Sequence, residues 1–309
     1  MKIFLHLGYP KTATTYLQKN IFSNHPDINY IGKFYKNPNK SKFIFELEKN
    51  IFCLNDKDFR KYVIKIKPKI KEKLNKKKIN LISNEAFLIN YNYNKISTTE
   101  KILDRLLRLF DKNLKIYILI FIRNHKDALR SNFNQFKHLL RRHDIFLKDL
   151  KFAINNNQDN VFLNNFNYYS IIKILKKNKL IFKTRIFFYE DFDNNKNFLM
   201  KSLCKFLNIK YLPHLNKEEK VRTHEDLKNN RLKELINLIK ITFKNKSFKL
   251  RYIINFFNFI TKREEYEILE KKHFDQYKER VMNFYSSDTK KLDKKYHKKL
   301  KKYFYLKNK

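Results

Sequence analysis

A glycine at the end of the first apolar run constrains this chain more than any other feature. The sequence has 309 residues and only two glycines, and one of them, Gly8, directly follows the apolar run 3–7. The run is typical of a buried strand, Gly8 and Pro10 interrupt it, and helical spacing resumes at Thr14. We therefore predict a strand, a tight loop and a helix, so that loop amides and the helix N-terminus point at one anion.

The residues of this loop add positive charge and hydrogen-bond donors. Lys11 supplies a cation, and Thr12, Thr14 and Thr15 supply hydroxyls around Ala13. The loop departs from the Gly-x-x-x-x-Gly-Lys-Ser/Thr pattern of nucleoside triphosphatases, because its lysine comes early and the second glycine is absent. An anion-binding loop of a different class is expected.

Apolar runs alternate with helical patterns along the first two thirds of the chain. The expected strands are Ile3–Leu7, Ile79–Ser83, Ile116–Ile122 and Ile181–Tyr189, and the expected helices are Thr14–Ser23, Ser97–Phe110, Lys126–Leu140, Tyr168–Lys177 and Asn195–Leu207. This alternation predicts an α/β fold with a parallel β-sheet flanked by helices on both faces, like that of P-loop NTPases. Only helical patterns follow Pro213. We expect a core domain over residues 1–215 and a C-terminal helical region over 216–309, packed on the core.

The residues that follow the strands indicate a second anion site. In open α/β sheets, ligands bind beyond the carboxyl ends of the strands. A magnesium-dependent nucleotide enzyme places an acidic residue there, whereas Arg123 ends the run 116–122. The next helix would bring Ser131 back towards this end, so that Arg123 and Ser131 could bind one phosphate together. Two separate phosphate sites fit a nucleotide that is phosphorylated at both ends of its ribose.

Two segments resemble the nucleotide-binding motifs of PAPS-dependent sulfotransferases. Residues 6–18, HLGYPKTATTYLQ, are similar to the 5′-phosphosulfate loop of that family, and residues 121–131, FIRNHKDALRS, are similar to its 3′-phosphate motif. Shorter similarities to bacterial members lie at 188–192, 203–209 and 285–303, and the resemblance is loose over 43–110 and 210–280. Ala13 stands where the family usually has glycine, so a negative φ is expected there. His125 replaces a common proline, with little effect expected.

The resemblance implies transfer of a sulfuryl group from 3′-phosphoadenosine 5′-phosphosulfate (PAPS) to a hydroxyl or amine of an acceptor, which leaves the bisphosphate PAP. The acceptor expected from the bacterial likeness is a glycan, with a small hydroxyl compound as the other choice. The residues expected to bind PAPS are Lys11, Thr12, Ala13, Thr14, Thr15, Arg123 and Ser131. Lys11 is the expected catalytic cation, and Glu85 is the expected base, unless it only caps a helix. No metal is required, because the protein supplies the cations.

The charge of the chain leaves other functions open. Seventy Lys and Arg against thirty Asp and Glu give a formal charge of +40, which favours anionic partners. The basic residues are spread along the chain without a recognisable nucleic-acid-binding module, so specific nucleic-acid binding is a weaker alternative, beside a P-loop kinase. The basic, aromatic segment 244–263 is expected to be a buried helix, and contact with an anionic membrane is its other interpretation.

The remaining features concern location and buried polar groups. The chain shows no signal peptide and no apolar stretch long enough to span a bilayer, which predicts a cytoplasmic protein, peripheral to the inner membrane face if segment 244–263 binds lipid. Cys53 and Cys204 are expected to be buried thiols without a disulfide. His6, inside the first strand, is expected to be a hydrogen-bonded core histidine.

Overall fold

The computed structural model describes residues 1–9, 11–35, 37–88, 99–136, 156, 161–164, 166–216, 278–292 and 300. Contacts divide the chain into two compact units, one formed by Met1–Lys217 with Glu279–Lys309 and the other by Glu218–Lys278. The segment 244–263 and most of the expected C-terminal helical region lie outside the described residues. The division into 1–215 and 216–309 therefore stays a prediction.

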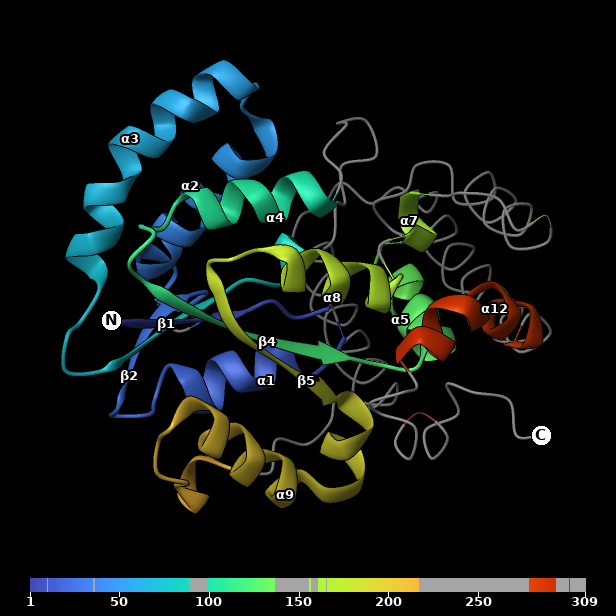
Figure 1. The fold of residues 1–309 in the computed structure, drawn as a ribbon. Helices are drawn as coiled ribbons and strands as arrows, with labels where there is room; N and C mark the ends of the chain where they lie inside the picture. Colours follow the sequence, from blue (N-terminus) through green and yellow to red (C-terminus); the bar gives the residue numbers. More distant parts are fainter. Residues whose placement is uncertain are drawn as a thin grey trace, which may run out of the picture. The chain divides into compact units, whose positions relative to one another are not determined.

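A parallel sheet forms the centre of the described fold (Figure 1). Its strands, in the order β2-β3-β1-β4-β5, are β1 (Lys2–His6), β2 (Ile28–Gly32), β3 (Ile79–Ser83), β4 (Lys115–Ile122) and β5 (Ile181–Phe188). Every neighbouring pair is parallel. The α/β fold class and the four expected strands are confirmed, and β2 is an additional strand that the apolar runs did not predict.

The strand order creates a crevice at the carboxyl ends of β1 and β4. The chain leaves β1 for β2 and β3 on one side of the sheet and then crosses to β4 on the other side. The parallel register pairs His6 with Ser83 of β3 and with Leu119 of β4. Strand order that reverses in this way opens a ligand-binding crevice beyond the strand ends.

Helices cover both faces of the sheet (Figure 1). One face carries α1 (Thr14–Tyr16), which continues as the π-helical η1 (Leu17–Phe22), together with α9 (Tyr189–Leu207). The other face carries α2 (Lys42–Cys53), α4 (Thr99–Arg108) and α8 (Tyr168–Lys177), and α3 (Asp56–Lys73) lies outside them. The remaining described elements are η2 (Pro38–Ser41), η3 (Glu85–Phe87), α5 (His125–Phe136), α7 (Val161–Asn164), η4 (Pro213–Leu215) and α12 (Lys278–Phe284).

The core between the sheet and the helices is largely aliphatic and aromatic. On the α1 and α9 side it includes Phe4, Leu17, Phe22, Leu81, Phe121, Phe187 and Leu203. The rings of Phe121 and Phe187 on β4 and β5 stack with centroids 5.0 Å apart. Burial of these side chains on both faces explains why β1 and β4 have continuous apolar sequences.

The helices agree with the sequence patterns except at their ends. Tyr168–Lys177 has the predicted bounds, and α5 is described as far as Phe136, with 137–140 outside the described residues. Helix α9 starts at Tyr189 rather than Asn195, but Asn195 has non-helical angles (φ −154°, ψ 70°) and its side chain accepts from the Phe198 amide at 3.1 Å. The residue at which the helix was predicted to start is therefore the site of a kink inside α9, and its side chain caps the part of the helix that follows. Helices α2 and α3 were not predicted, since lysines interrupt much of their apolar pattern.

Buried polar groups follow the predictions in part. His6 is fully buried, as expected, and burial lowers its pKa to about 3. Cys204 is buried, whereas the prediction for Cys53 is wrong, because this residue ends α2 and is exposed to solvent. Among the described residues, no helix combines the length and the apolar character needed to cross a bilayer.

Candidate active site

Gly8 is needed for close packing under the loop. A Cβ atom at Gly8 would lie 2.5 Å from Oγ1 of Thr14 and 3.2 Å from Nε2 of His6. The first distance is shorter than real Cβ contacts and the second is tighter than most, so a larger residue would require Thr14 to shift. Gly8 does not adopt a positive φ, so its role here is the close approach of the backbone to Thr14.

Two non-glycine residues of the loop adopt left-handed backbone angles. Lys11 has φ 63°, and Ala13 has φ 61° and ψ 16°. The expectation of a negative φ at Ala13 is therefore wrong, because the loop keeps the left-handed turn for which glycine is the usual residue. Left-handed residues other than glycine cost free energy and concentrate at functional sites. The side chain of Lys11 is exposed to solvent.

The threonines of the loop divide into internal and external groups. Thr12 and Thr14 are buried, and both donate to the carbonyl oxygen of Tyr9, at 2.5 Å and 3.3 Å. Their hydroxyls thus stabilise the loop itself. Thr15 is exposed, and its Oγ1 lies 3.4 Å from the Tyr35 hydroxyl oxygen. Of the three predicted hydroxyls, this one faces outward.

Arg123 lies against the loop. Its Nη1 donates to the carbonyl oxygen of Lys11 at 3.2 Å, and its guanidinium carbon lies 4.4 Å from the centroid of the Tyr189 ring. The Arg123 backbone is also held, because its carbonyl accepts from the Tyr168 hydroxyl at 2.7 Å and the next amide, of Asn124, donates to Glu190 at 2.6 Å. The guanidinium predicted from the second motif therefore lies against the backbone of the loop predicted from the first motif.

Ser131 lies farther along the second motif. It is half-buried in α5, which begins at His125. A rise of about 1.5 Å per residue places it roughly 9 Å along the helix from His125, or nearly two turns. Joint binding of one phosphate by Arg123 and Ser131 stays a prediction.

Glu85 lies beside both Lys11 and a lysine that the sequence did not indicate. It is the first residue of η3, directly after β3, and its Oε1 lies 3.7 Å from Nζ of Lys33. Burial raises the pKa of Glu85, while the positive charges of Lys33 and Lys11 oppose the rise and Glu48 adds to it. The two residues predicted to be catalytic, Lys11 and Glu85, thus interact electrostatically across the mouth of the loop.

Helix capping belongs to Asn84 rather than to Glu85. The Asn84 side chain accepts from the Ala86 amide at 3.0 Å, which caps η3. The same side chain donates to Oε2 of Glu48 at 2.8 Å and so connects η3 with α2. Asn84 therefore fills the structural role that was the alternative for Glu85.

Sequence reasoning missed Lys33, Tyr35 and Glu48 at this site. Lys33 and Tyr35 follow β2, the unpredicted strand, and Glu48 belongs to α2, an unpredicted helix. A usable signal was Gly32, the second glycine of the chain, which ends β2 much as Gly8 follows β1.

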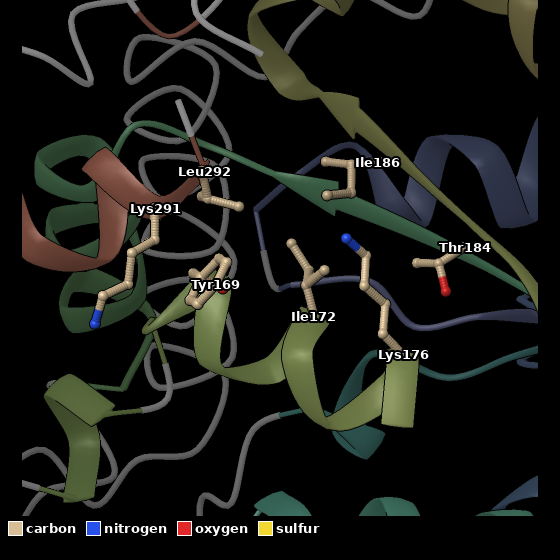
Figure 2. Close-up of a pocket in the computed structure, with 7 residues that line it drawn as sticks. All are labelled: Tyr169, Ile172, Lys176, Thr184, Ile186, Lys291 and Leu292. Carbon is tan, nitrogen blue, oxygen red and sulfur yellow. The ribbon is translucent and has the colours of Figure 1, made fainter. Parts of the chain in front are cut away.

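A small cavity lies between α8, β5 and residues 291–292 (Figure 2). It measures about 50 Å³ and is lined by Tyr169, Ile172, Lys176, Thr184, Ile186, Lys291 and Leu292. In Figure 2 the Lys176 amine points between Ile172 and Ile186, while the Lys291 amine points away. The cavity is large enough for water molecules and contains none of the predicted site residues.

Comparison with known proteins returns sulfotransferases among the solved structures. No protein-family model matches the chain, and no curated protein matches its sequence. A sulfotransferase from Alicyclobacillus acidocaldarius is similar over 74% of this chain and 90% of its own, with 15% identity and a TM-score of 0.46. The sulfotransferase domain of a Synechococcus olefin synthase is similar over 70% of this chain and 76% of its own, with 13% identity and a TM-score of 0.38.

A mouse sulfotransferase crystallised with PAP is also similar to the chain. The similarity covers 68% of this chain and 59% of the mouse protein, with 16% identity and a TM-score of 0.34. These likenesses, like the two bacterial ones, concern the arrangement of the sheet and its helices.

Proposed function

We propose that this protein is a sulfotransferase that uses PAPS as the sulfuryl donor and releases PAP. The observation that carries the proposal is the approach of Arg123 to the loop, with Nη1 at 3.2 Å from the Lys11 carbonyl. Two cationic side chains from different strands then stand at one crevice, as a nucleotide with phosphates at both ends requires. Glu85, close enough to interact with Lys11, supplies a candidate base at the same place.

The residues present suit PAPS. The space kept free at Gly8 allows the loop to pack tightly on Thr14, which leaves the loop amides and the start of the helical segment 14–22 as an anion cradle. Arg123 has five N–H donors, so one bond to the Lys11 carbonyl leaves others for a 3′-phosphate. Lys11, Thr15 and the loop backbone would hold the 5′ end, and Arg123 with Ser131 would hold the 3′ end.

The chemistry divides between one cation and one carboxylate. PAPS supplies a sulfuryl group that is activated for transfer. Lys11 would stabilise the negative charge that develops on the leaving phosphate oxygen, which is an interaction stronger in the transition state than in the ground state. Glu85 would accept the proton of the acceptor hydroxyl or amine. Lys33, at 3.7 Å from Glu85, favours the ionised form that a base requires.

The acceptor we propose is a glycan, and the site of action is the cytoplasm. The high positive charge of the chain suits an anionic or bulky acceptor better than a cationic one. A small hydroxyl compound is the competing acceptor. Peripheral contact with an anionic membrane rests on segment 244–263, which lies outside the described residues.

Calorimetric titration with PAP, AMP and ATP tests the donor assignment, first without magnesium. We expect PAP to bind at least tenfold more tightly than AMP, since a phosphate bound by charge-assisted hydrogen bonds contributes about 1.5–3 kcal/mol. Equal binding of PAP and AMP would contradict the proposal. Binding of ATP that requires magnesium, together with phosphoryl transfer, would support the kinase alternative instead.

A further inference from the structure

The segment after β2 presents alternate side chains to opposite sides. Phe34 faces the core, where the centroid of its ring lies 4.9 Å from the centroid of the Tyr30 ring. The neighbouring side chains of Lys33 and Tyr35 instead contact site residues. The Lys33 amine lies 3.7 Å from Oε1 of Glu85, and the Tyr35 hydroxyl lies 3.4 Å from Oγ1 of Thr15. The segment therefore places two polar side chains next to Glu85 and Thr15.

Helix α2 contributes further side chains near Glu85. Ile44, Leu47 and Ile51 are buried against the core, while Phe45 and Glu48, three residues apart, lie on a common helix surface. The Lys33 amine lies 5.8 Å from the centroid of the Phe45 ring. Glu48 accepts from Asn84, the neighbour of Glu85, at 2.8 Å.

A buried chain of hydrogen bonds holds the Tyr35 hydroxyl in place. Tyr35 donates to Oε1 of Gln18 at 3.0 Å, the Gln18 amide donates to Ser83 at 2.9 Å, and Ser83 bonds to Nδ1 of His6 at 2.7 Å. Gln18, Ser83 and His6 are all buried. The other ring nitrogen of His6, Nε2, faces Gly8, where an added Cβ would lie 3.2 Å away.

Tyr35 is thus an exposed ring with a fixed hydroxyl. Its exposed fraction is 43%, and that of Phe45 is 47%. Large apolar surfaces that remain exposed and already ordered lose little conformational entropy when a ligand covers them. The charged groups of Lys33, Glu85 and Glu48 belong to the same neighbourhood, because the Lys33 amine lies near both the Phe45 ring and Glu85, and Glu48 bonds to Asn84, the neighbour of Glu85.

We propose, on the basis of the proposed sulfuryl transfer, that Tyr35 and Phe45 form the acceptor-binding walls beside Glu85, and that the acceptor they receive is a sugar ring. A sugar has an apolar C–H face that can lie on an aromatic ring, and hydroxyls at its edge that can reach charged groups. The edge hydroxyl next to Glu85 is then the one that loses its proton. Lys33 and Glu48 bind the neighbouring hydroxyls.

Phenols and long-chain alcohols suit this arrangement less well. Each of them has one hydroxyl for Glu85 and none for Lys33 or Glu48, whose remaining hydrogen-bonding capacity would then be desolvated without a ligand group to satisfy it. Such acceptors would call for an apolar enclosure rather than exposed rings near charged groups. The combination of aromatic rings with several charged side chains therefore favours a ligand that carries several hydroxyls.

The test compares aromatic variants with a matched exposed phenylalanine. The variants are Tyr35→Ala, Tyr35→Phe and Phe45→Ala, and the control is Phe198→Ala on α9, where the wild-type side chain is 57% exposed. The full chain is assayed for PAP release with chitotetraose, maltotetraose and a hyaluronan tetrasaccharide, and with 2-naphthol and 1-octanol. Calorimetry measures the Kd for PAP of every variant.

We expect turnover of at least one oligosaccharide, with KM raised roughly tenfold by Phe45→Ala and by Tyr35→Ala. Tyr35→Phe keeps the ring and should have a smaller effect on KM. The Kd for PAP and the activity of Phe198→Ala should stay at the wild-type values. Turnover of naphthol or octanol alone, no turnover of any oligosaccharide, or an unchanged oligosaccharide KM in both alanine variants would each overturn this inference. Failure of the wild type to bind PAP would instead overturn the proposed function.

Discussion

The guanidinium of Arg123 donates to the carbonyl oxygen of Lys11 across 3.2 Å, although 112 residues separate the two in the chain. The contact exists because β1 and β4 are adjacent parallel strands, which bring both carboxyl ends to the same edge of the sheet. The Tyr189 ring supports the guanidinium at 4.4 Å. The geometry therefore brings the Arg123 guanidinium to the backbone of the loop that carries Lys11.

Arg123→Ala should weaken binding of PAP and leave binding of AMP nearly unchanged. Loss of a charge-assisted hydrogen bond of about 1.5–3 kcal/mol corresponds to a roughly 10- to 100-fold rise in the Kd for PAP. Calorimetry measures both ligands. Arg185→Ala removes an exposed arginine from β5 and serves as the control. An equal loss of affinity for PAP and AMP would show that Arg123 does not select the 3′-phosphate.

Lys11→Asn should lower kcat much more than it weakens PAP binding. Asparagine tolerates the left-handed backbone of this position (φ 63°), so the loop should keep its shape while the cation is lost. Removal of one preorganised transition-state contact costs about 10²–10³ in kcat. Steady-state kinetics beside PAP calorimetry separates the two effects. Lys19→Asn, at an exposed lysine of η1, is the control, and wild-type turnover in Lys11→Asn would contradict the catalytic role.

Ala13→Gly should leave the protein as stable as the wild type or more stable. A left-handed non-glycine residue costs roughly 1–2 kcal/mol, which exceeds the 0.5–1 kcal/mol that glycine costs in unfolded-state entropy. Ala128→Gly, in the helical backbone of α5, lacks this relief and should lower the unfolding temperature. Thermal unfolding of both variants gives the comparison. Destabilisation of equal size in both would mean that Ala13 is not strained.

The Lys33 charge should set the acid limb of the pH–rate profile. Glu85 must be ionised to accept a proton, and Lys33→Met removes a charge that lowers its pKa. The fall in kcat/KM on acidification should therefore begin at a higher pH in Lys33→Met. Lys49→Met, at an exposed lysine of α2, should keep the wild-type profile. An unmoved acid limb in Lys33→Met would separate Lys33 from the base.

Glu85→Gln should lower activity and raise stability at neutral pH. Because burial raises the folded-state pKa of Glu85 above 4.5, the stability present below that pH is lost as the pH rises and the buried carboxyl ionises. Glutamine avoids this cost. Removal of a general base costs about 10²–10⁴ in rate. Unfolding at pH 7 and a rate assay measure the two effects, and a less stable, fully active variant would contradict both.

Asp56 should stabilise the α2, α3 and α4 layer above its pKa. Its carboxylate accepts from the buried Arg105 at 2.6 Å and pairs with Lys101, which lowers the pKa of Asp56 to about 2. This stability is present above the ordinary value of 3.8 and is lost as the pH falls towards 2. Asp56→Asn should lower the unfolding temperature at pH 7 and flatten its decline between these values. Asp104→Asn, which breaks an exposed pair with Arg108, should change little.

Local patterns predicted much of the fold and several site residues. The strands β1, β3, β4 and β5 are largely apolar runs, and Lys11, Glu85 and Arg123 each come shortly after one of them. Strand β2 was missed because Ile28–Gly32 ends in glycine and has fewer aliphatic residues than β3, which has the same length. The Asn29 side chain donates a hydrogen bond to Oδ1 of Asn80 on β3 at 2.8 Å, a partner 51 residues away that no local pattern shows.

The sequence by itself determined that an apolar strand would lead into a loop carrying Lys11, and that another would end in Arg123, because hydrophobic periodicity is a local property. Only the tertiary structure decided that Thr12 and Thr14 turn inward, that Ala13 is left-handed, and that Lys33 and Tyr35 stand beside Glu85. These features depend on parallel pairing and burial between segments far apart in the chain. The free energy that selects them arises from contacts that exist only after the sheet has formed.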